Sequence, residues 1–142
     1  MADDFTQANR RLRIDTPLGP DKLLVTSVAG GEALSSLFHF DAELVGPDTF
    51  DFEKVVGKPM TISIASVQGT RYFSGICSRI SQGGTVADHG SYRAEIVPWL
   101  WFLTRTADCR IFQKISVPDI IKKIFSDLGF NDYAFRLQGT YE

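Results

Sequence analysis

The sequence predicts a mainly β fold: a β-barrel with short helices, followed by one amphipathic helix, so that the chain is α+β as a whole. Three observations predict it. Apolar and polar residues alternate with a period of two in several runs between residues 12 and 97, and glycine-containing turns separate those runs. One long stretch, near 117–128, has helical spacing instead. Strands followed by a helix indicate a closed or sandwiched β unit with a further segment after it.

The first two strands are predicted on either side of the turn residues 16–21. Leu12 and Ile14 alternate with charged neighbours, and the apolar run 23–28 follows the turn, so we expect these segments to form a hairpin. The polar and apolar residues 32–36 suit one helical turn.

The middle of the chain continues the strand pattern. Alternation predicts strands over 38–44, 60–64 and 71–80, with a short helix at Phe52–Val56 between the first two. Gly75, inside the third of these strands, indicates a bulge or a close backbone approach.

A polar loop at 81–91 is then predicted to lead into a strand at Tyr92–Ile96, which makes a second hairpin. The helix near 117–128 has Ser116 as its cap, Pro118 in its first turn and Gly129 after its end.

Composition limits the function classes. The 142 residues are 44% hydrophobic and 23% charged, which suits one folded unit, and the net charge of -2 gives no reason to expect a nucleic-acid partner. No run of eighteen apolar residues and no export signal is visible, so we expect no stable membrane insertion and no signal peptide. Cys77 and Cys109 match neither a disulfide framework nor a zinc site, and both are predicted to be reduced, semi-buried thiols.

Candidates for chemistry are scarce. His39 and His89 are interpreted as surface histidines, and Asp41 and Glu43 as solvated carboxylates on one strand face. The basic residues Arg10, Arg11 and Arg13 are interpreted as guards of an edge strand. Nucleophile-elbow and phosphate-loop motifs do not occur, so the sequence predicts no catalytic, metal-binding or cofactor-binding residue and no enzyme.

The aromatic stretch 98–104, followed by residues 110–113, concentrates both tryptophans of the chain. Two interpretations stay open. The rings could fill the open end of the barrel, or some of them, with Phe112, could lie in a subunit interface, where aromatic residues are enriched.

Five short motifs follow one another along the chain: Gly31-Glu32-x-Leu34-Ser35-x-Leu37-Phe38, Gly57-Lys58-Pro59, Arg71-x-Phe73-x-Gly75, Pro98-Trp99-Leu100-x-x-Leu103 and Arg110-Ile111-Phe112-Gln113. In this order they resemble the amino-terminal region of the VgrG family, the spike proteins of the bacterial type VI secretion system. They cover nearly the whole chain, from about Leu12 to Tyr141. The positions singled out as signature or assembly candidates are Glu32, Leu34, Phe38, Gly75, Pro98, Trp99, Leu103, Arg110, Phe112 and Gln113.

The resemblance implies a phage tail-hub-like barrel in the head of a homotrimeric spike. Such a head sits on the Hcp tube ring, and a PAAR tip protein and effectors attach through regions absent from this sequence. The spike assembles in the bacterial cytoplasm and is then injected across the envelope, so its work is mechanical and needs no cofactor.

The resemblance also implies that the chain is a fragment of a larger protein. We expect residues 1–110 to form the first barrel, which is incomplete without later strands, and residues 111–142 to begin a connecting segment. Two rival functions stay open: the hub of a phage tail or of another contractile injection system, and a small flavin-binding split-barrel enzyme.

Overall fold

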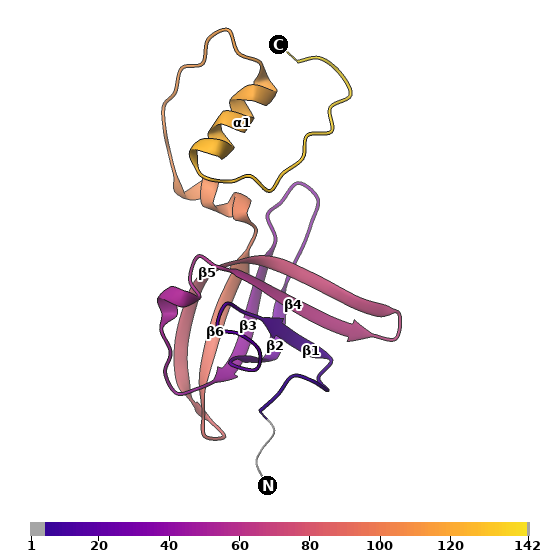
Figure 1. Cartoon of the computed structure of the whole chain (residues 1–142), viewed down its shortest axis with the longest axis vertical. Helices are drawn as coiled ribbons and strands as arrows, with labels where there is room; N and C mark the ends of the chain where they lie inside the picture. Colours follow the sequence, from indigo (N-terminus) through magenta and orange to yellow (C-terminus); the bar gives the residue numbers. More distant parts are fainter. Residues whose placement is uncertain (1–4, 142) are drawn as a thin grey trace. The chain divides into compact units, whose positions relative to one another are not determined.

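The computed structural model describes residues 5–141 and divides them into two compact units, one ending at Leu103 and the other beginning at Thr104. The first unit is a six-stranded antiparallel sheet with the order β1-β4-β5-β6-β3-β2, curled into an open barrel (Figure 1). Its strands are β1 (Leu12–Asp15), β2 (Leu24–Gly31), β3 (His39–Gly46), β4 (Pro59–Ser66), β5 (Gly69–Val86) and β6 (His89–Val97). The prediction of a mainly β barrel is confirmed.

The core of the barrel lies on the inner face of the sheet, where the alternation of the sequence directs every second side chain. In β3, Phe40, Ala42 and Leu44 are buried while their neighbours are more exposed. The same pattern holds in β6, where Tyr92, Ala94 and Ile96 are buried. Burial of this apolar area is the main favourable contribution to folding.

Strand β5 is the element that curves the sheet, because it belongs to two ladders. Its first half, residues 69–76, pairs with β4, and its second half, residues 76–86, pairs with β6. Bulges interrupt the second ladder between Cys77 and Arg79 and between Gln82 and Thr85. Bulges bend a strand and increase its twist, which allows one long strand to serve both sides of the barrel.

Gly75 lies at the change between the two ladders. A side chain there would meet the Val97 carbonyl oxygen at 2.6 Å and the Ile96 Cγ2 at 2.7 Å. Of the two expectations for Gly75, the close backbone approach is therefore confirmed, and the bulges lie further along the strand.

The predicted hairpin between the first two strands is wrong. β1 pairs with β4, with Ile14 opposite Ile62, whereas β2 pairs with β3. β1 and β2 are the two edges of the sheet, and its curl brings them near each other without a ladder. The turn residues 16–21 determine only where the chain reverses direction. Which strand β1 and β2 each pair with depends on strands that are distant in the sequence.

The predicted helical turn at residues 32–36 is also wrong. These residues form a non-helical turn in which Ser35 has a φ of +60°. This segment connects β2 to β3, so its geometry is set by the pairing of those strands.

The predicted loop at 81–91 is instead most of a hairpin. β5 runs on to Val86, and Ala87 and Asp88, with φ of 47° and 64°, make a two-residue turn into β6. Gly83 lets the strands approach, because a side chain there would meet the Ser91 Oγ at 2.6 Å. The glycines of residues 81–91 therefore reflect the close approach of β5 and β6 and the bulge in β5.

Within residues 5–141, three helices accompany the strands. η1 (Phe52–Lys54) is capped by Asp51, which accepts from the Glu53 backbone N–H, so the short helix predicted there is confirmed in position. η2 (Trp99–Arg105) follows Pro98. α1 (Val117–Asp127) belongs to the second unit and begins at the predicted cap, Ser116.

α1 carries the predicted apolar stripe, but that stripe is only partly covered. Pro118 is the buried residue of α1. The ring of Phe125 contacts the ring of Tyr133 edge to face, and the ring of Tyr133 contacts that of Phe135 in the same way. Lys122 lies 5.5 Å from the centre of the Phe135 ring. The second unit therefore buries far less apolar surface than the barrel. No helix within residues 5–141 is long and apolar enough to cross a membrane.

The two cysteines occupy different environments, which corrects one expectation. Both are free thiols, but Cys77 is buried in the barrel while Cys109 is exposed rather than semi-buried. Burial raises the pKa of the Cys77 thiol to about 11. The thiol donates a hydrogen bond to the Arg79 carbonyl. Because the thiolate is the reactive form, Cys77 should be inert in the folded protein.

Thiol titration is expected to count one reactive cysteine in the native protein and two after denaturation. The Cys109→Ser variant should show none before unfolding and one after it. Rapid labelling of both thiols in native wild-type protein, with unchanged circular dichroism, would contradict the buried position of Cys77.

Candidate assembly surface

Three of the candidate residues, Glu32, Phe38 and Gly75, meet on one side of the barrel. Glu32 forms a 2.6 Å ion pair with Arg71, so the β2–β3 connection is tied to the β4–β5 hairpin. The guanidinium carbon of Arg71 also lies 4.6 Å from the centre of the Phe73 ring. The side chain of Arg71 thus combines an ion pair with a cation–π contact.

Aromatic rings continue inward from this ion pair. Phe38 and Phe40 have ring centres 5.5 Å apart, and Phe40 and Phe73 have ring centres 4.8 Å apart. Phe38 also reaches Gly75, where an added Cβ would lie 3.1 Å from its ring. The structure therefore brings together Glu32, Phe38 and Gly75, which are 43 residues apart at most.

Leu34 and the aromatic stretch occupy different positions. Leu34, in the β2–β3 connection, is 99% exposed. Pro98 follows the last residue of β6, and Trp99 and Leu103 are half-buried in η2. Trp101 and Phe102 pack edge to face at 5.2 Å. The two interpretations of this stretch, filling of the barrel end and subunit contact, both stay predictions.

The remaining candidates belong to the second unit. Arg110 forms two ion pairs of 2.6 Å, with Asp108 and Asp127, and so ties the chain before α1 to the end of that helix. Phe112 is half-buried and Gln113 is exposed. Arg110 therefore has a structural role within this unit, and a separate assembly role for these residues stays a prediction.

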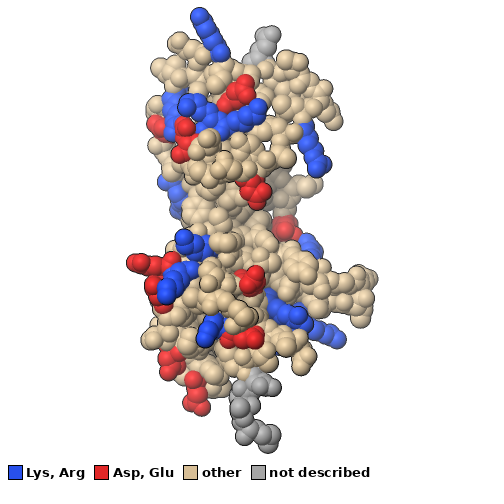
Figure 2. Space-filling model, viewed as in Figure 1, with Lys and Arg blue, Asp and Glu red and all other residues tan. Residues whose placement is uncertain are grey.

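The outer face of β3, β6 and β5 carries a ladder of alternating charges. Asp41 lies opposite Glu95 in the register, and Arg93 relieves this like-charge pairing through a 3.0 Å hydrogen bond to Asp41. His39 lies 3.4 Å from the same carboxylate, and Arg79 lies 3.7 Å from Glu95. Figure 2 shows both signs of charge interspersed on the barrel rather than a broad region of one sign. The surface interpretation of His39 and Asp41 agrees with this ladder.

Asp41 should make the barrel sensitive to acid. The hydrogen bond from Arg93 lowers the pKa of Asp41 below its ordinary value of 3.8, against a smaller effect of burial. A lowered folded-state pKa means that the ionised carboxylate stabilises the fold at neutral pH, and that this contribution is lost as the pH falls below 3.8.

Urea unfolding of wild type and Asp41→Asn should therefore differ at neutral pH and converge in acid. Glu53→Gln, which also removes one negative charge at an exposed position in η1, serves as the control. A difference between wild type and Asp41→Asn that grew in acid would have the wrong sign and would refute the assignment.

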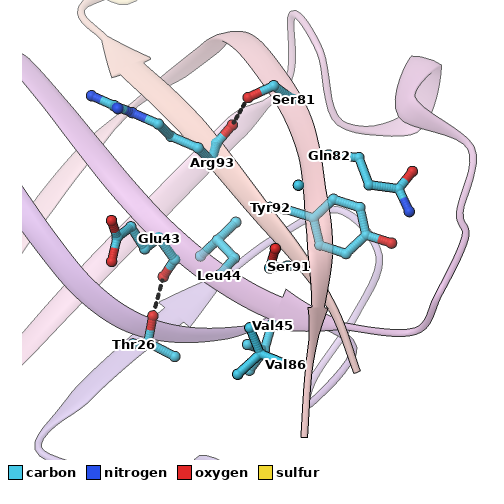
Figure 3. Close-up of a pocket in the computed structure, with 11 residues that line it drawn as sticks. Thr26, Glu43, Leu44, Val45, Ser81, Gln82, Val86, Ser91, Tyr92 and Arg93 are labelled. Atoms are coloured by element: carbon cyan, nitrogen blue, oxygen red, sulfur yellow. Dashed lines mark hydrogen bonds between the residues drawn. The ribbon is translucent and has the colours of Figure 1, made fainter. Parts of the chain in front are cut away.

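A shallow groove of about 470 Å³ also lies on this sheet, lined by residues of β2, β3, β5 and β6 (Figure 3). It combines the apolar Val45 and Val86 with charged groups that are already engaged. The Thr26 hydroxyl donates to the Glu43 carbonyl at 3.1 Å, and the Glu43 carboxylate accepts from the Ser27 hydroxyl at 2.7 Å. These bonds link neighbouring strands, so the polar groups of the groove have a structural role. Within the described part of the chain, no cluster of metal-ligating residues occurs.

Sequence reasoning placed Arg71 in a family motif with Phe73 and Gly75 but did not select it as an assembly candidate, although it is the ion-pair partner of Glu32. One signal was available: Arg71 is the only charged residue in the twenty residues from Pro59 to Ser78. Its partner, Glu32, lies 39 positions away and is visible only in the fold.

The fold defines the protein as a tail-hub-like barrel protein. A solved E. coli structure, that of the c3393 protein, aligns with a TM-score of 0.68 at 22% identity and covers 92% of this chain and 36% of that chain. It is described as a component of the type VI secretion system with structural similarity to the T4 bacteriophage tail proteins gp27 and gp5. The chain belongs to the phage tail baseplate hub (GPD) family, whose model matches residues 31–142.

Two curated relatives are type VI secretion system spike proteins of Pseudomonas aeruginosa. VgrG1c is 44% identical over 139 residues, and VgrG1a is 45% identical over 140 residues. The matches cover 96% and 95% of this chain but only 19% and 21% of those proteins, so the chain spans about a fifth of their length. The resemblance to the VgrG family and the hub-like fold, both predicted from the sequence, are confirmed.

Proposed function

We propose that this chain forms the first barrel in the head of a trimeric spike that caps the Hcp tube of a type VI secretion machine. The observation that carries the proposal is the 44–45% identity to spike proteins over 95–96% of the chain. Identity at this level, without long gaps in coverage, supports the same role for this segment in the larger protein.

The proposal assigns different roles to the two segments of the chain. Residues 1–110 form the barrel, completed by later strands, and residues 111–142 begin the connecting segment. The candidate residues Glu32, Leu34, Phe38 and Gly75, with those at 98–103 and 110–113, shape and position the surfaces that the assembly uses. The Glu32–Arg71 pair and the aromatic contacts behind it support this role for the first group.

The role proposed for the chain is mechanical rather than enzymatic. The head is assembled in the bacterial cytoplasm, and contraction of a sheath drives spike, tube and effectors across the envelope into a target cell. The PAAR tip and the effectors attach to parts of the protein outside this segment. An antiparallel sheet suits this role because its hydrogen bonds connect all six strands across the barrel.

A second candidate is the hub of a phage tail, which the family description itself favours. Neighbouring genes separate the two: sheath, tube and ATPase genes accompany a secretion spike, whereas capsid and portal genes accompany a phage hub. Membership of the hub family favours either of these over the flavin-binding alternative.

The decisive experiment is deletion of the gene in a source strain that lacks its other spike genes. Release of the Hcp tube protein into the medium is expected to stop, because a tube without its cap is not assembled for firing. Reintroduction of the intact gene is expected to restore release. Unchanged Hcp release after deletion would refute the secretion-spike function.

A further inference from the structure

Strand β1 forms one edge of the sheet. Within residues 5–141 it pairs with β4 alone, and β2 lies near it without forming a ladder. The Ala65 N–H donates to the Arg11 carbonyl at 2.8 Å, so the backbone groups of Arg11 face β4. Because these groups alternate between the two sides of a strand, those of Ile14 face the unpaired edge. An edge of this kind can pair with an extended segment of another polypeptide, which leads to aggregation.

The side chain of Gln7 occupies this edge at Ile14. The Ile14 backbone N–H donates to the Gln7 Oε1 at 2.7 Å, and the Gln7 Nε2 donates to the Ile14 carbonyl at 2.9 Å. A side-chain amide offers a carbonyl acceptor and N–H donors, as a peptide group does. Gln7 therefore satisfies both backbone groups of Ile14 in the way that a residue of a partner strand would.

Asp21 anchors the segment that carries Gln7, residues 6–10, which is called here the N-terminal arm. The Asp21 carboxylate accepts hydrogen bonds from the Gln7 backbone N–H at 2.9 Å and from the Thr6 hydroxyl at 3.1 Å. Asp21 precedes β2 and has a φ of +56°, a left-handed conformation that aspartate adopts more readily than most residues. The arm thus connects β1 to the segment before β2, across the seam where these two strands form no ladder.

Arg13 holds the arm from β1 itself. Its guanidinium donates to the Ala8 carbonyl through Nη2 and to the Arg10 carbonyl through Nε, each at 2.9 Å. The Arg10 N–H in turn donates to the Gln7 carbonyl at 3.0 Å, which closes a turn within the arm. Arg13, interpreted from the sequence as a guard of an edge strand, therefore acts on the arm through the forked geometry of its donors.

We propose that the N-terminal arm is an edge guard, which occupies the strand-pairing groups of Ile14 and so prevents an extended segment of another polypeptide from pairing with β1. Asp21 and Arg13 hold the Gln7 amide in place from two sides. The inference does not rest on the proposed function. It leaves β2 available to a later strand that completes the barrel, because none of these bonds involves residues 24–31.

The first test is amide hydrogen exchange of the folded chain, measured residue by residue by nuclear magnetic resonance. The Ile14 amide is expected to be protected in wild type. Gln7→Met keeps the length of the side chain and removes its amide, so it should speed Ile14 exchange by about tenfold. The Arg13 amide, which faces β4, is the internal control and should keep its protection in this variant.

Arg13→Lys separates the guanidinium contacts from the effect of charge alone. Lysine keeps the positive charge but lacks the fork of donors that binds two carbonyls of the arm. We expect faster Ile14 exchange in this variant as well. An Ile14 exchange rate equal to that of wild type would overturn the role of Arg13 in holding the arm.

The second test is aggregation at raised protein concentration, followed by light scattering and thioflavin T fluorescence. Reducing conditions prevent disulfides through the exposed Cys109. Gln7→Met is expected to aggregate faster than wild type, because Ile14 then presents an unpaired edge. Gln68→Met is the matched control: it makes the same substitution at an exposed glutamine between β4 and β5, and it should aggregate like wild type.

Four results would overturn the inference. The Ile14 amide could exchange freely in wild type, or its exchange could be the same in Gln7→Met. The Arg13 amide could lose protection in parallel with Ile14, which would indicate general destabilisation rather than loss of edge pairing. Finally, the two methionine variants could aggregate alike. None of these measurements involves Hcp release, so failure of the inference and failure of the proposed function are distinguishable.

Discussion

Replacement of Ile62 by alanine is expected to lower the free energy of unfolding by about 2–5 kcal/mol, the range for truncation of a large aliphatic side chain in a packed core. Ile62 is fully buried in β4 and lies in register between Ile14 of β1 and Phe73 of β5. The cavity would thus open where three strands meet. Urea unfolding followed by far-ultraviolet circular dichroism measures the loss, and the midpoint should fall without a change in the native spectrum.

Ile64→Ala provides the comparison within the same strand. Ile64 is two residues further along the same face, but it is 37% exposed, so less apolar area returns to water when it is truncated. We expect a clearly smaller loss than for Ile62. Equal losses for the two variants would show that the inner face of β4 is not buried as the fold describes.

Replacement of Gly75 by alanine is expected to destabilise the barrel by about 1–3 kcal/mol, the range for overpacking. The new methyl group would lie 2.6 Å from the Val97 carbonyl oxygen, which is backbone and cannot move aside as a flexible side chain could. The strain would arise at the point where the pairing of β5 changes from β4 to β6. Thermal melts should show the loss.

Gly84→Ala is the control, because it lies in the same strand and an added methyl group there meets nothing within 4 Å. It should be neutral or slightly stabilising, since alanine reduces the entropy of the unfolded chain. If Gly75→Ala and Gly84→Ala melted alike, the close approach at Gly75 would not be the reason for a glycine at that position.

The strands and the helix were predictable because their signals are local. The alternation of Phe40, Ala42 and Leu44 directs one face inward whatever strand lies beside it. The capping of α1 by Ser116 needs only the residues of its first turn. The family resemblance was predictable for a similar reason, since it depends on short motifs in a fixed order.

The errors arose where composition and pairing disagree. Residues 81–91 are rich in glycine and serine, as loops are, but the pairing of β5 with β6 extends to Val86 and His89. The turn at 16–21 suggested a hairpin, but β1 pairs with β4 instead. Cys109 was expected to be semi-buried on the preference of its residue type, which says nothing about its neighbours.

The sequence by itself determined which residues face inward, where the chain turns and to which family it belongs, because periodicity, turn chemistry and motif order are properties of neighbouring residues. The tertiary structure decided which strands pair, that β5 serves two ladders and that Glu32 meets Arg71. Those contacts join residues far apart in the chain. Their geometry is set by the curl of the whole sheet, which no local pattern encodes.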